Sequence, residues 1–286
     1  MFRELLNQCK IMLELRPEGP LLIREALDDL DPTLPELQCV RTFTPFGRVP
    51  YVPGSSLKGA LRAFSEKVLR SADPARGACS PGSRACRGGN WRELCLACRT
   101  FGSPRLAGRA RFSDAMPWSS ETAPQERAAA AGAVVVERRS GGPAGRDGAR
   151  APYDLEAVVA GSFHAEVSLR NHALWQLGLV GLAVRELNSG ALRLGSGKSR
   201  GFGGVKTSIK SIELEQWGRL ASLEEVAGAP ISGHGSGAPD RMPAPGPGEN
   251  NGLFRRWRLE GAAASEWLLQ PGLWSSLVFR PEEGSR

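Results

Sequence analysis

The sequence predicts an α+β fold, with two helices on one face of a sheet. An opening strand, a turn and a second extended run are expected within residues 10–24, and apolar residues recur at helical spacing in two later segments. The order is strand, helix, strands, helix, strand, which fits a ferredoxin-like (RRM-like) core. The later elements are expected at 54–68 (helix), 109–116, 133–137 and 161–169 (strands), 172–188 (helix) and 206–214 (strand).

The first helix begins after Pro53, where two hydroxyl residues precede an apolar stripe. Ser55 or Ser56 is expected to cap it, because a hydroxyl accepts a bond from an unpaired first-turn N–H. Lys58 and Arg62 lie one turn apart on another face. The free N–H groups and the positive dipole end favour phosphate, whereas the alternative is an ordinary capped helix. The stripe consists of Leu57, Leu61, Phe64 and Val68.

A glycine-rich run, 195–204, superficially resembles a nucleotide-binding P-loop. The P-loop spacing requires glycine at position 192, which is Leu192, and the run follows a helix instead of a strand. The sequence therefore argues against a nucleotide hydrolase. We expect a flexible loop with exposed amides, Lys198 and Arg200, suited to close approach of a nucleic-acid backbone. The alternative is a glycine-rich turn with incidental charge.

Four cysteines lie within 71–104, a segment that reads as an insertion without apolar periodicity. Cys95 and Cys98 have the C-x2-C spacing that lets two thiolates share a tetrahedral ion, and Cys79 and Cys86 supply two more sulfurs. We expect structural zinc, because four sulfur ligands leave no open position, and the alternative is free thiols. Cys9 and Cys39 are isolated and are expected to be packing residues.

The 286-residue chain carries a net charge of +7, which favours a polyanionic partner such as nucleic acid or an anionic membrane surface. The alternative is a soluble protein that is merely basic. No signal peptide or membrane-length apolar run is seen, so a cytoplasmic protein without membrane contact is expected. The cysteines then point to metal or free thiols before disulfides.

The domain boundaries follow from composition. A core is expected over 1–226, including the insertion 71–104 and a hairpin at 133–160. Residues 227–252 are rich in glycine and proline and are expected to form a mobile linker. The tryptophan-containing segment 253–286 is expected to dock on the core or on a neighbouring subunit.

Four segments together resemble the RAMP superfamily of CRISPR proteins. PYVPGSSLKGALR resembles its PGSSLKG helix start, and LGSGKSRGFGGV resembles its glycine-rich loop. FGSPRLAGRARFSDAM resembles the corresponding strand of the type III backbone subunits, and the stretch from Val134 to Leu169 resembles their thumb-like β-hairpin and return strand. The resemblance covers most of residues 10–214 and follows the family's motif order.

The resemblance implies a repeating subunit that polymerises along a guide RNA (crRNA) and positions target RNA for antiviral defence. Its partners would be guide RNA, target RNA, other RAMP subunits and a large polymerase-like subunit. The thumb would wedge into the guide–target duplex, and it would carry, or lie near, Arg138, Arg139, Arg146 and Arg150. The alternative interpretation is that these arginines lie in a solvated loop and bind nothing. The implied guide-phosphate contacts are Ser55, Ser56, Lys58, Arg62, Ser196, Gly197, Lys198, Ser199, Arg200, Gly201, Phe202 and Gly203.

Many type III backbone subunits cut target RNA with an Asp in the loop before the PGSSLKG helix. An ungapped count back from Pro50 puts Gln38 at that position, and Gln cannot take a proton. A longer loop would let Asp31 take the role, with Asp28 and Asp29 as alternatives, acting with Mg²⁺ or another divalent ion. An exposed acidic loop without catalytic function is the other interpretation.

Overall fold

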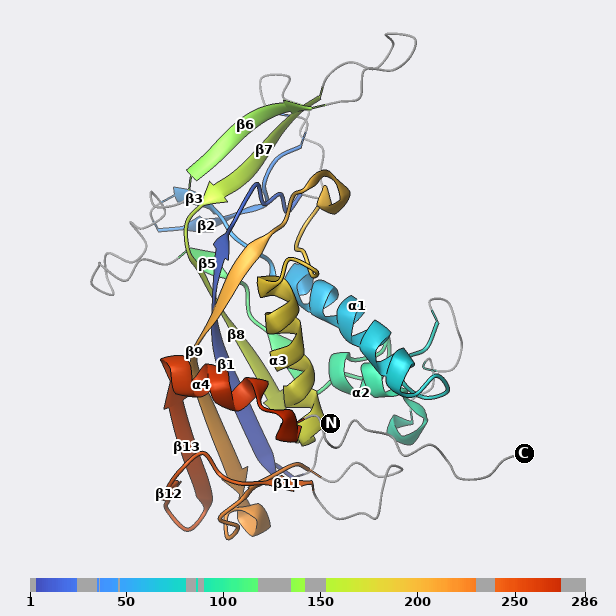
Figure 1. Cartoon of the computed structure of the whole chain (residues 1–286), viewed down its shortest axis with the longest axis vertical. Helices are drawn as coiled ribbons and strands as arrows, with labels where there is room; N and C mark the ends of the chain where they lie inside the picture. Colours follow the sequence, from blue (N-terminus) through green and yellow to red (C-terminus); the bar gives the residue numbers. More distant parts are fainter. Residues whose placement is uncertain are drawn as a thin grey trace.

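A computed structural model describes residues 4–24, 35, 37–45, 47–80, 86, 90–117, 135–141, 153–229 and 240–273. Its main element is a large antiparallel sheet with strand order β12-β13-β9-β1-β8-β4, and β5 also pairs with β8 (Figure 1). The predicted α+β class is confirmed. The strands are β1 (Asn7–Pro17), β4 (Ala110–Phe112), β5 (Met116–Pro117), β8 (Phe163–Arg170), β9 (Val205–Trp217), β12 (Glu249–Asn250) and β13 (Phe254–Glu260).

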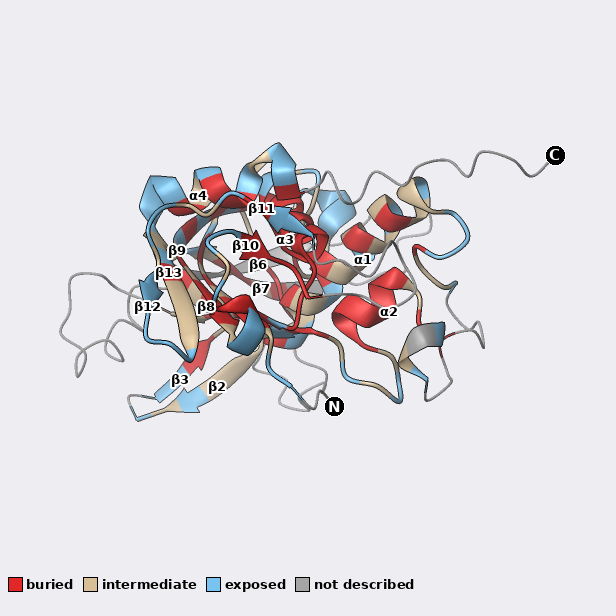
Figure 2. Ribbon diagram, turned by 90° about the horizontal axis from the view of Figure 1, so that it is seen from below, coloured by how far each residue is buried: buried red, intermediate tan, exposed pale blue. Residues whose placement is uncertain are grey.

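Helices α1 (Gly54–Ala72), α3 (Leu174–Asn188) and α4 (Gly261–Leu269) cover one face of this sheet (Figures 1 and 2). Alternate residues of β1, such as Ile11 and Leu13, point into that face and are fully buried. Helix α3 is apolar on nearly all sides because the sheet, α1 and α4 enclose it. The short helix α2 (Leu96–Phe101) packs beside α1.

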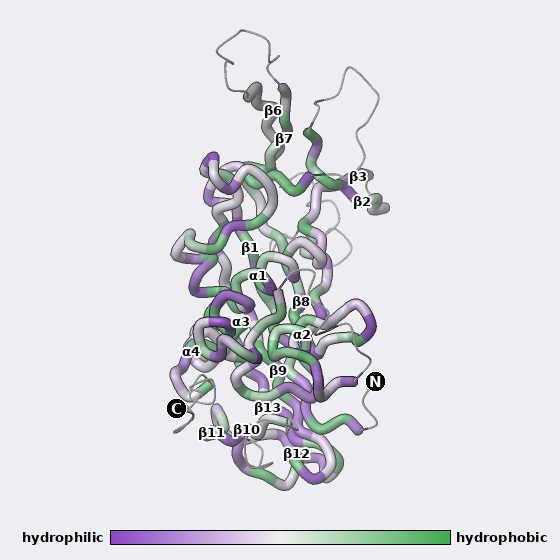
Figure 3. The backbone as a smooth tube through the Cα atoms, turned by 90° about the vertical axis from the view of Figure 1, so that its right-hand side faces the viewer, coloured by the Kyte–Doolittle hydropathy of each residue, from purple (hydrophilic) through white to green (hydrophobic). Residues whose placement is uncertain are grey.

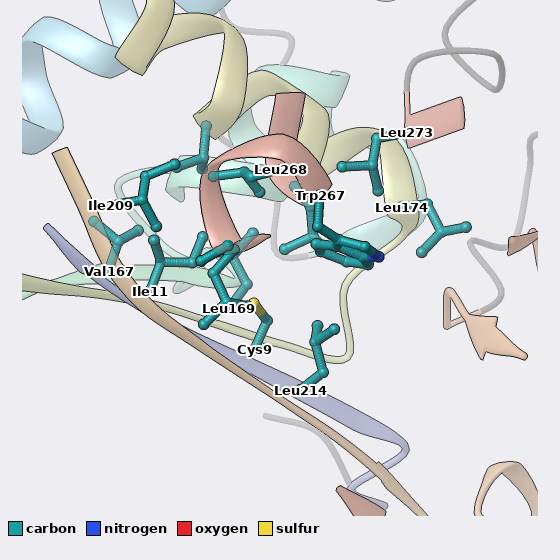
Figure 4. Close-up of a cluster of buried hydrophobic side chains, with 14 of the residues drawn as sticks. Cys9, Ile11, Val167, Leu169, Leu174, Ile209, Leu214, Trp267, Leu268 and Leu273 are labelled. Atoms are coloured by element: carbon teal, nitrogen blue, oxygen red, sulfur yellow. The ribbon is translucent and has the colours of Figure 1, made fainter. Parts of the chain in front are cut away.

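The two largest hydrophobic clusters of the described part lie along the sheet, and a smaller one joins α1, α2 and α3. One of the two largest joins β1, β8 and β9 to α3 and α4, and it includes Trp267 and Leu268 (Figure 4). The other joins α1, through Leu57 and Leu61, to the opposite end of the sheet. Helices α3 and α4 approach so closely that a Cβ on Gly181 would lie 2.3 Å from the Leu268 carbonyl oxygen. Glycine is therefore required at this crossing.

The opposite face of the sheet is polar. Glu14 on β1 accepts hydrogen bonds from Ser162 (2.6 Å) and Ser208 (3.0 Å) and pairs with Lys210 (2.6 Å) and Arg16 (2.8 Å). Burial raises the pKa of the Glu14 carboxyl, but these donors outweigh burial and hold the pKa well below its usual range. The face is therefore stabilised by paired charges and carries no large apolar surface at its centre.

Two hairpins stand at one end of the long axis (Figures 1 and 3). One is formed by β2 (Arg41–Thr44) and β3 (Gly47–Pro50), and the other by β6 (Val135–Gly141) and β7 (Tyr153–Ala160). Strand β7 continues almost directly into β8, with a turn at Gly161, whose φ is +125°. The second hairpin therefore leads directly into a strand of the central sheet.

The segment predicted to be a mobile linker is ordered at both ends. Strand β10 (Val226–Ala227) pairs with β11 (Arg241–Met242), and the Asn7 side-chain amide donates to the Ala227 carbonyl (2.9 Å). Residues 230–239 lie outside the described part. Strand β13 pairs with β9, so residues 254–273 dock on the core of their own chain. Long-range pairing overrides the local glycine and proline content here.

His172 gives the fold a testable pH dependence. The imidazole is fully buried before α3, and burial, its largest influence, lowers its pKa to about 3. The unfolded chain therefore binds this proton first as pH falls below the ordinary value of 6.5. We expect this imidazole to lower the free energy of unfolding by about 1.4 kcal/mol for each pH unit as the pH falls from about 6 to 3.

Urea unfolding at pH 7.5, 6.0 and 5.0 measures this effect, with His172→Asn as the comparison. The difference between the two pH slopes isolates the imidazole, because all other titrating groups are common to both proteins. Parallel slopes for the two proteins would show that His172 does not titrate on unfolding in this range.

Candidate nucleic-acid interface and metal centre

Helix α1 begins differently from the sequence prediction. Neither Ser55 nor Ser56 caps it; instead the Gly54 N–H donates to the Asp114 carboxylate (2.7 Å) from the segment between β4 and β5. A Cβ on Gly54 would lie 2.6 Å from the Phe112 carbonyl oxygen, so this tight contact requires glycine. The expected capping by serine is wrong. Because the Asp114 carboxylate already accepts the first amide N–H of the helix, we expect contacts to a phosphate here to come mainly from side chains.

Asp114 was not among the residues predicted to matter. It lies within the predicted strand 109–116, in the sequence Ser113-Asp114-Ala115, two residues after β4 ends. The signal was a carboxylate at a strand end, but its partner is 60 residues away in the sequence, and periodicity does not identify such pairs.

A groove runs between α1 and the glycine-rich loop, with a volume of about 570 Å³. We call it the α1–loop groove. Small residues Gly59 and Ala63 of α1 keep its floor open, and Ser56 also faces it. The lining residues include four basic side chains and no acid. Its basic residues are Arg24, Lys67, Arg193 and Lys198.

The glycine-rich loop has a defined conformation, held by hydrogen bonds to residues 20–22, where the sequence predicts a flexible loop. The Ser196 N–H donates to the Leu22 carbonyl (2.8 Å), and the Gly203 N–H donates to the Pro20 carbonyl (2.9 Å). Gly203 has a φ of +82°, and a Cβ there would lie 2.0 Å from the Leu194 carbonyl oxygen. Here glycine serves a fixed conformation.

Part of the predicted loop faces outward and part faces inward. Lys198 to Arg200 form a 3₁₀ turn, and the residues from Lys198 to Gly201 are exposed, as is Ser196. Phe202 packs against the core, its ring contacting Gly197, and Gly203 is buried. The side chains that can reach a ligand are therefore those of the turn and of Ser196.

Lys58 and Arg62 lie on the other flank of α1. They line a second groove of about 610 Å³ with Ser55 and Arg111, next to the loop 102–108. Burial, and secondarily Arg62, lowers the pKa of the Lys58 ammonium. The structure thus separates Lys58 from Lys198 and brings Ser56 and Lys67 to the glycine-rich loop instead.

The four predicted cysteines form a cluster that could hold a metal ion. Their sulfurs all lie within 4.8 Å of one another, and the Cys79 and Cys98 sulfurs are 3.7 Å apart. Tetrahedral Zn²⁺ with bonds of about 2.3 Å separates its sulfurs by about 3.8 Å, whereas a disulfide requires about 2.05 Å. Amide N–H groups of Cys95 and Cys98 donate to the Cys86 and Cys95 sulfurs (3.3 and 3.4 Å). The residues therefore fit a structural zinc ion.

Charged residues on one face of α1 hold the cluster. The Arg62 guanidinium donates to the Cys98 sulfur (3.5 Å) and the Gly102 carbonyl (3.0 Å), and Arg70 donates to the Cys79 carbonyl (3.1 Å). Glu66 lies between them and pairs with both arginines (2.8 and 3.2 Å). Four thiolates around Zn²⁺ carry a net charge of −2, which the Arg62 charge partly offsets. The predicted contact of Arg62 with phosphate therefore competes with three protein partners.

The remaining predicted residues are less fully described. Arg138 and Arg139 lie on β6, paired with Glu156 and Leu155, and only their backbone is described. Gln38 is half-buried ahead of β2. Arg146, Arg150, Asp28, Asp29 and Asp31 lie outside the described residues, so their roles stay predictions.

The fold and these sites define a basic α+β protein with a four-cysteine cluster that could hold a metal ion and a groove lined by basic residues. The sequence model of the RAMP superfamily matches residues 14–206, which is more than half of the chain. The chain therefore belongs to the RAMP superfamily.

Among solved structures, the chain is similar to a chain in "Cryo-EM structure of the Type III-B Cmr-beta bound to cognate target RNA". The identity is 17%, the TM-score is 0.44, and the match covers 73% of this chain and 61% of that chain. The chain thus spans less than two thirds of this relative's length. No curated protein matches it. Among the described helices, none has the length and apolar character needed to span a membrane.

Proposed function

We propose that the chain is a guide-RNA-binding backbone subunit of a type III CRISPR complex that positions target RNA. The observation that carries the proposal is the α1–loop groove, where four basic side chains and Ser56 line one acid-free channel. Membership of the RAMP superfamily supports it. The order β1-α1-β4-β8-α3-β9, with β9, β1, β8 and β4 adjacent in the sheet, supports the ferredoxin-like core.

The groove suits a ribose–phosphate chain because lysine and arginine neutralise phosphates without reading bases. The ordered glycine-rich loop presents Lys198 and Ser196 to the groove from one side, and α1 presents Ser56 and Lys67 from the other. Small α1 residues between them allow close approach of a backbone. Such a site binds RNA strongly at low salt and with little sequence preference.

The β6–β7 hairpin is proposed as the thumb that enters the guide–target duplex. Its strands form a sheet of their own and project from the end of the molecule where the β2–β3 hairpin also lies (Figure 1), while Leu155, Ala157 and Val158 of β7 pack on the core. Other RAMP subunits and a large polymerase-like subunit would complete the complex. The zinc ion would be structural, holding the insertion against the flank of α1 that carries Arg62 and Arg70.

Purification of the chain from its native host, or from cells that express it with a repeat array, tests the proposal. We expect co-purifying RNA of uniform length that high salt releases. Extraction, nuclease treatment and sizing on a denaturing gel distinguish guide RNA from random fragments. Protein that is free of nucleic acid and fails to bind an unstructured 40-nucleotide RNA at low salt would contradict the proposed function.

A further inference from the structure

Phe43, on β2, is unusually exposed. Its side chain is 81% accessible, the highest value among the large hydrophobic residues of the described part. Burying such a ring would contribute about 1.5–3 kcal/mol, which the isolated chain does not gain. Among the described residues its ring contact is with Arg48, and most of the ring surface stays open to a ligand.

The ring is held in a defined place on its hairpin. Phe43 pairs across the strands with Arg48, whose guanidinium carbon lies 5.5 Å from the ring centroid. The Thr44 hydroxyl donates to the Gly47 carbonyl (2.9 Å) and closes the turn. The cation and the ring therefore form one unit at the tip of the hairpin.

The base of this hairpin is fixed to the neighbouring hairpin through Glu156 of β7. The Glu156 carboxylate pairs with the Arg41 guanidinium (2.8 Å) and accepts the Cys39 N–H (3.4 Å). The Glu156 N–H in turn donates to the Leu37 carbonyl (2.8 Å). The two hairpins lie at the same end of the molecule (Figures 1 and 3), and these contacts tie the base of the β2–β3 hairpin to β7.

We propose that Phe43 is a stacking platform for an unpaired RNA base, with Arg48 contributing charge beside it. This site deepens the proposed function and rests on it. An exposed aromatic ring next to a cation is the combination that binds single-stranded nucleic acid without sequence preference. Residues 37–45 and 47–50 contain Arg41 and Arg48 and no acid, which suits an anionic strand.

A protein partner is the less favoured occupant. Protein docking surfaces present contiguous apolar area, whereas the strand neighbours of Phe43 are Thr42 and Thr44 and its cross-strand neighbour is Arg48. Among the described residues of the hairpin, Phe43 is the one aromatic ring and its neighbours are polar or basic, which matches a base that needs only one flat face and a nearby positive charge.

The variant Phe43→Leu tests the proposal by fluorescence anisotropy with a labelled 20-nucleotide oligouridylate. Loss of one stacked base is expected to weaken binding by about 5- to 150-fold. The slope of log affinity against log salt is expected to stay unchanged, because phenylalanine carries no charge. Phe43→Trp keeps a stacking face and should bind like the wild type. Folding should be unaffected, because the side chain is exposed, and thermal melting checks this.

Leu253→Ala is the matched control, because Leu253 is also exposed (63%) but lies in the β12–β13 turn at the other end of the molecule (Figure 1). Its RNA affinity should equal that of the wild type. In a second readout, a 5-iodouridine RNA irradiated on the wild-type protein should cross-link to the peptide that contains Phe43.

The outcomes separate the two proposals. Wild-type protein that binds no RNA would overturn the proposed function. Wild-type protein that binds RNA with the same affinity as Phe43→Leu would overturn the stacking site alone. A Phe43→Leu variant that changes self-association or subunit assembly in light scattering, with RNA affinity intact, would assign the ring to a protein contact and also overturn the stacking site.

Discussion

Chelation of the metal is expected to unfold the insertion around the four cysteines while the central sheet stays folded. Zinc contributes about 10–16 kcal/mol to the folding of zinc-finger peptides at neutral pH. The apolar residues beside the cluster are few, with Leu94 as the one fully aliphatic buried side chain of that group. Packing of these few side chains is not expected to keep the cysteine segment folded once the metal is removed.

Hydrogen exchange with and without a strong chelator measures the effect. Amides of residues 90–95 should lose protection, whereas those of β1 and β8 should keep it. Helix α2 should also stay protected, because Leu96, Ala97 and Phe101 pack in the neighbouring hydrophobic clusters. The end of α1 is expected to loosen as well, because Arg62 and Arg70 bind the cluster through Cys98 and the Cys79 carbonyl. Cys98→Ser should reproduce the effect of the chelator and lower the melting temperature.

Cys39→Ser provides the control, since Cys39 is buried like Cys98 but lies outside the cluster. It should leave one zinc ion per chain by elemental analysis. A wild-type protein without bound metal, whose insertion exchanges slowly in the presence of chelator, would show that packing alone holds these residues.

Local sequence signals were sufficient for the order of β1, α1, β4, β8, α3 and β9 and for the cysteine cluster, but not for the β2–β3 hairpin, α2, β13 or α4. The 3.6-residue spacing of Leu57 and Leu61 predicts the buried stripe of α1, and both side chains are fully buried. The Cys95-x2-Cys98 spacing predicts converging thiolates, and Cys79 and Cys86 join them. In these cases a side chain's role depends on its near neighbours, so a single sequence reveals it.

The residue spacing along α1 already indicates that its polar side chains lie on two different flanks of the helix. Ser55, Lys58 and Arg62 recur at three- and four-residue steps and line one groove. Ser56 and Lys67 are spaced so that they lie on the opposite flank, and they line the α1–loop groove. Side chains two residues apart point to different sides of a helix. A single binding surface joining Lys58 to Lys198 was therefore geometrically excluded.

Contacts between distant segments were not predictable from composition. The Asp114 carboxylate reaches Gly54, and β13 adds to the sheet beside β9 after a stretch rich in glycine and proline. The rigid form of the glycine-rich loop depends on carbonyls of Pro20 and Leu22, far away in the sequence. Composition predicted mobility in both segments because it carries no information about such partners.

Replacing both Lys67 and Lys198 by alanine is expected to weaken RNA binding strongly. Each lysine lines the α1–loop groove and is exposed, so the substitutions should not disturb the fold. If each neutralises one phosphate of a single strand, the slope of log affinity against log salt should decrease in magnitude by about 1.4. The loss of affinity should be about 10- to 100-fold near physiological salt and should be similar for all RNA sequences.

The salt dependence of RNA binding by this double variant is the most direct test of the groove. The control is Arg241→Ala with Arg258→Ala, which removes the same charge from β11 and β13. A shallower slope in the lysine variant, with a wild-type slope in the arginine control, is the predicted result. Equal slopes for the wild type and the lysine variant would contradict the claim that α1 and the glycine-rich loop jointly bind the phosphate backbone.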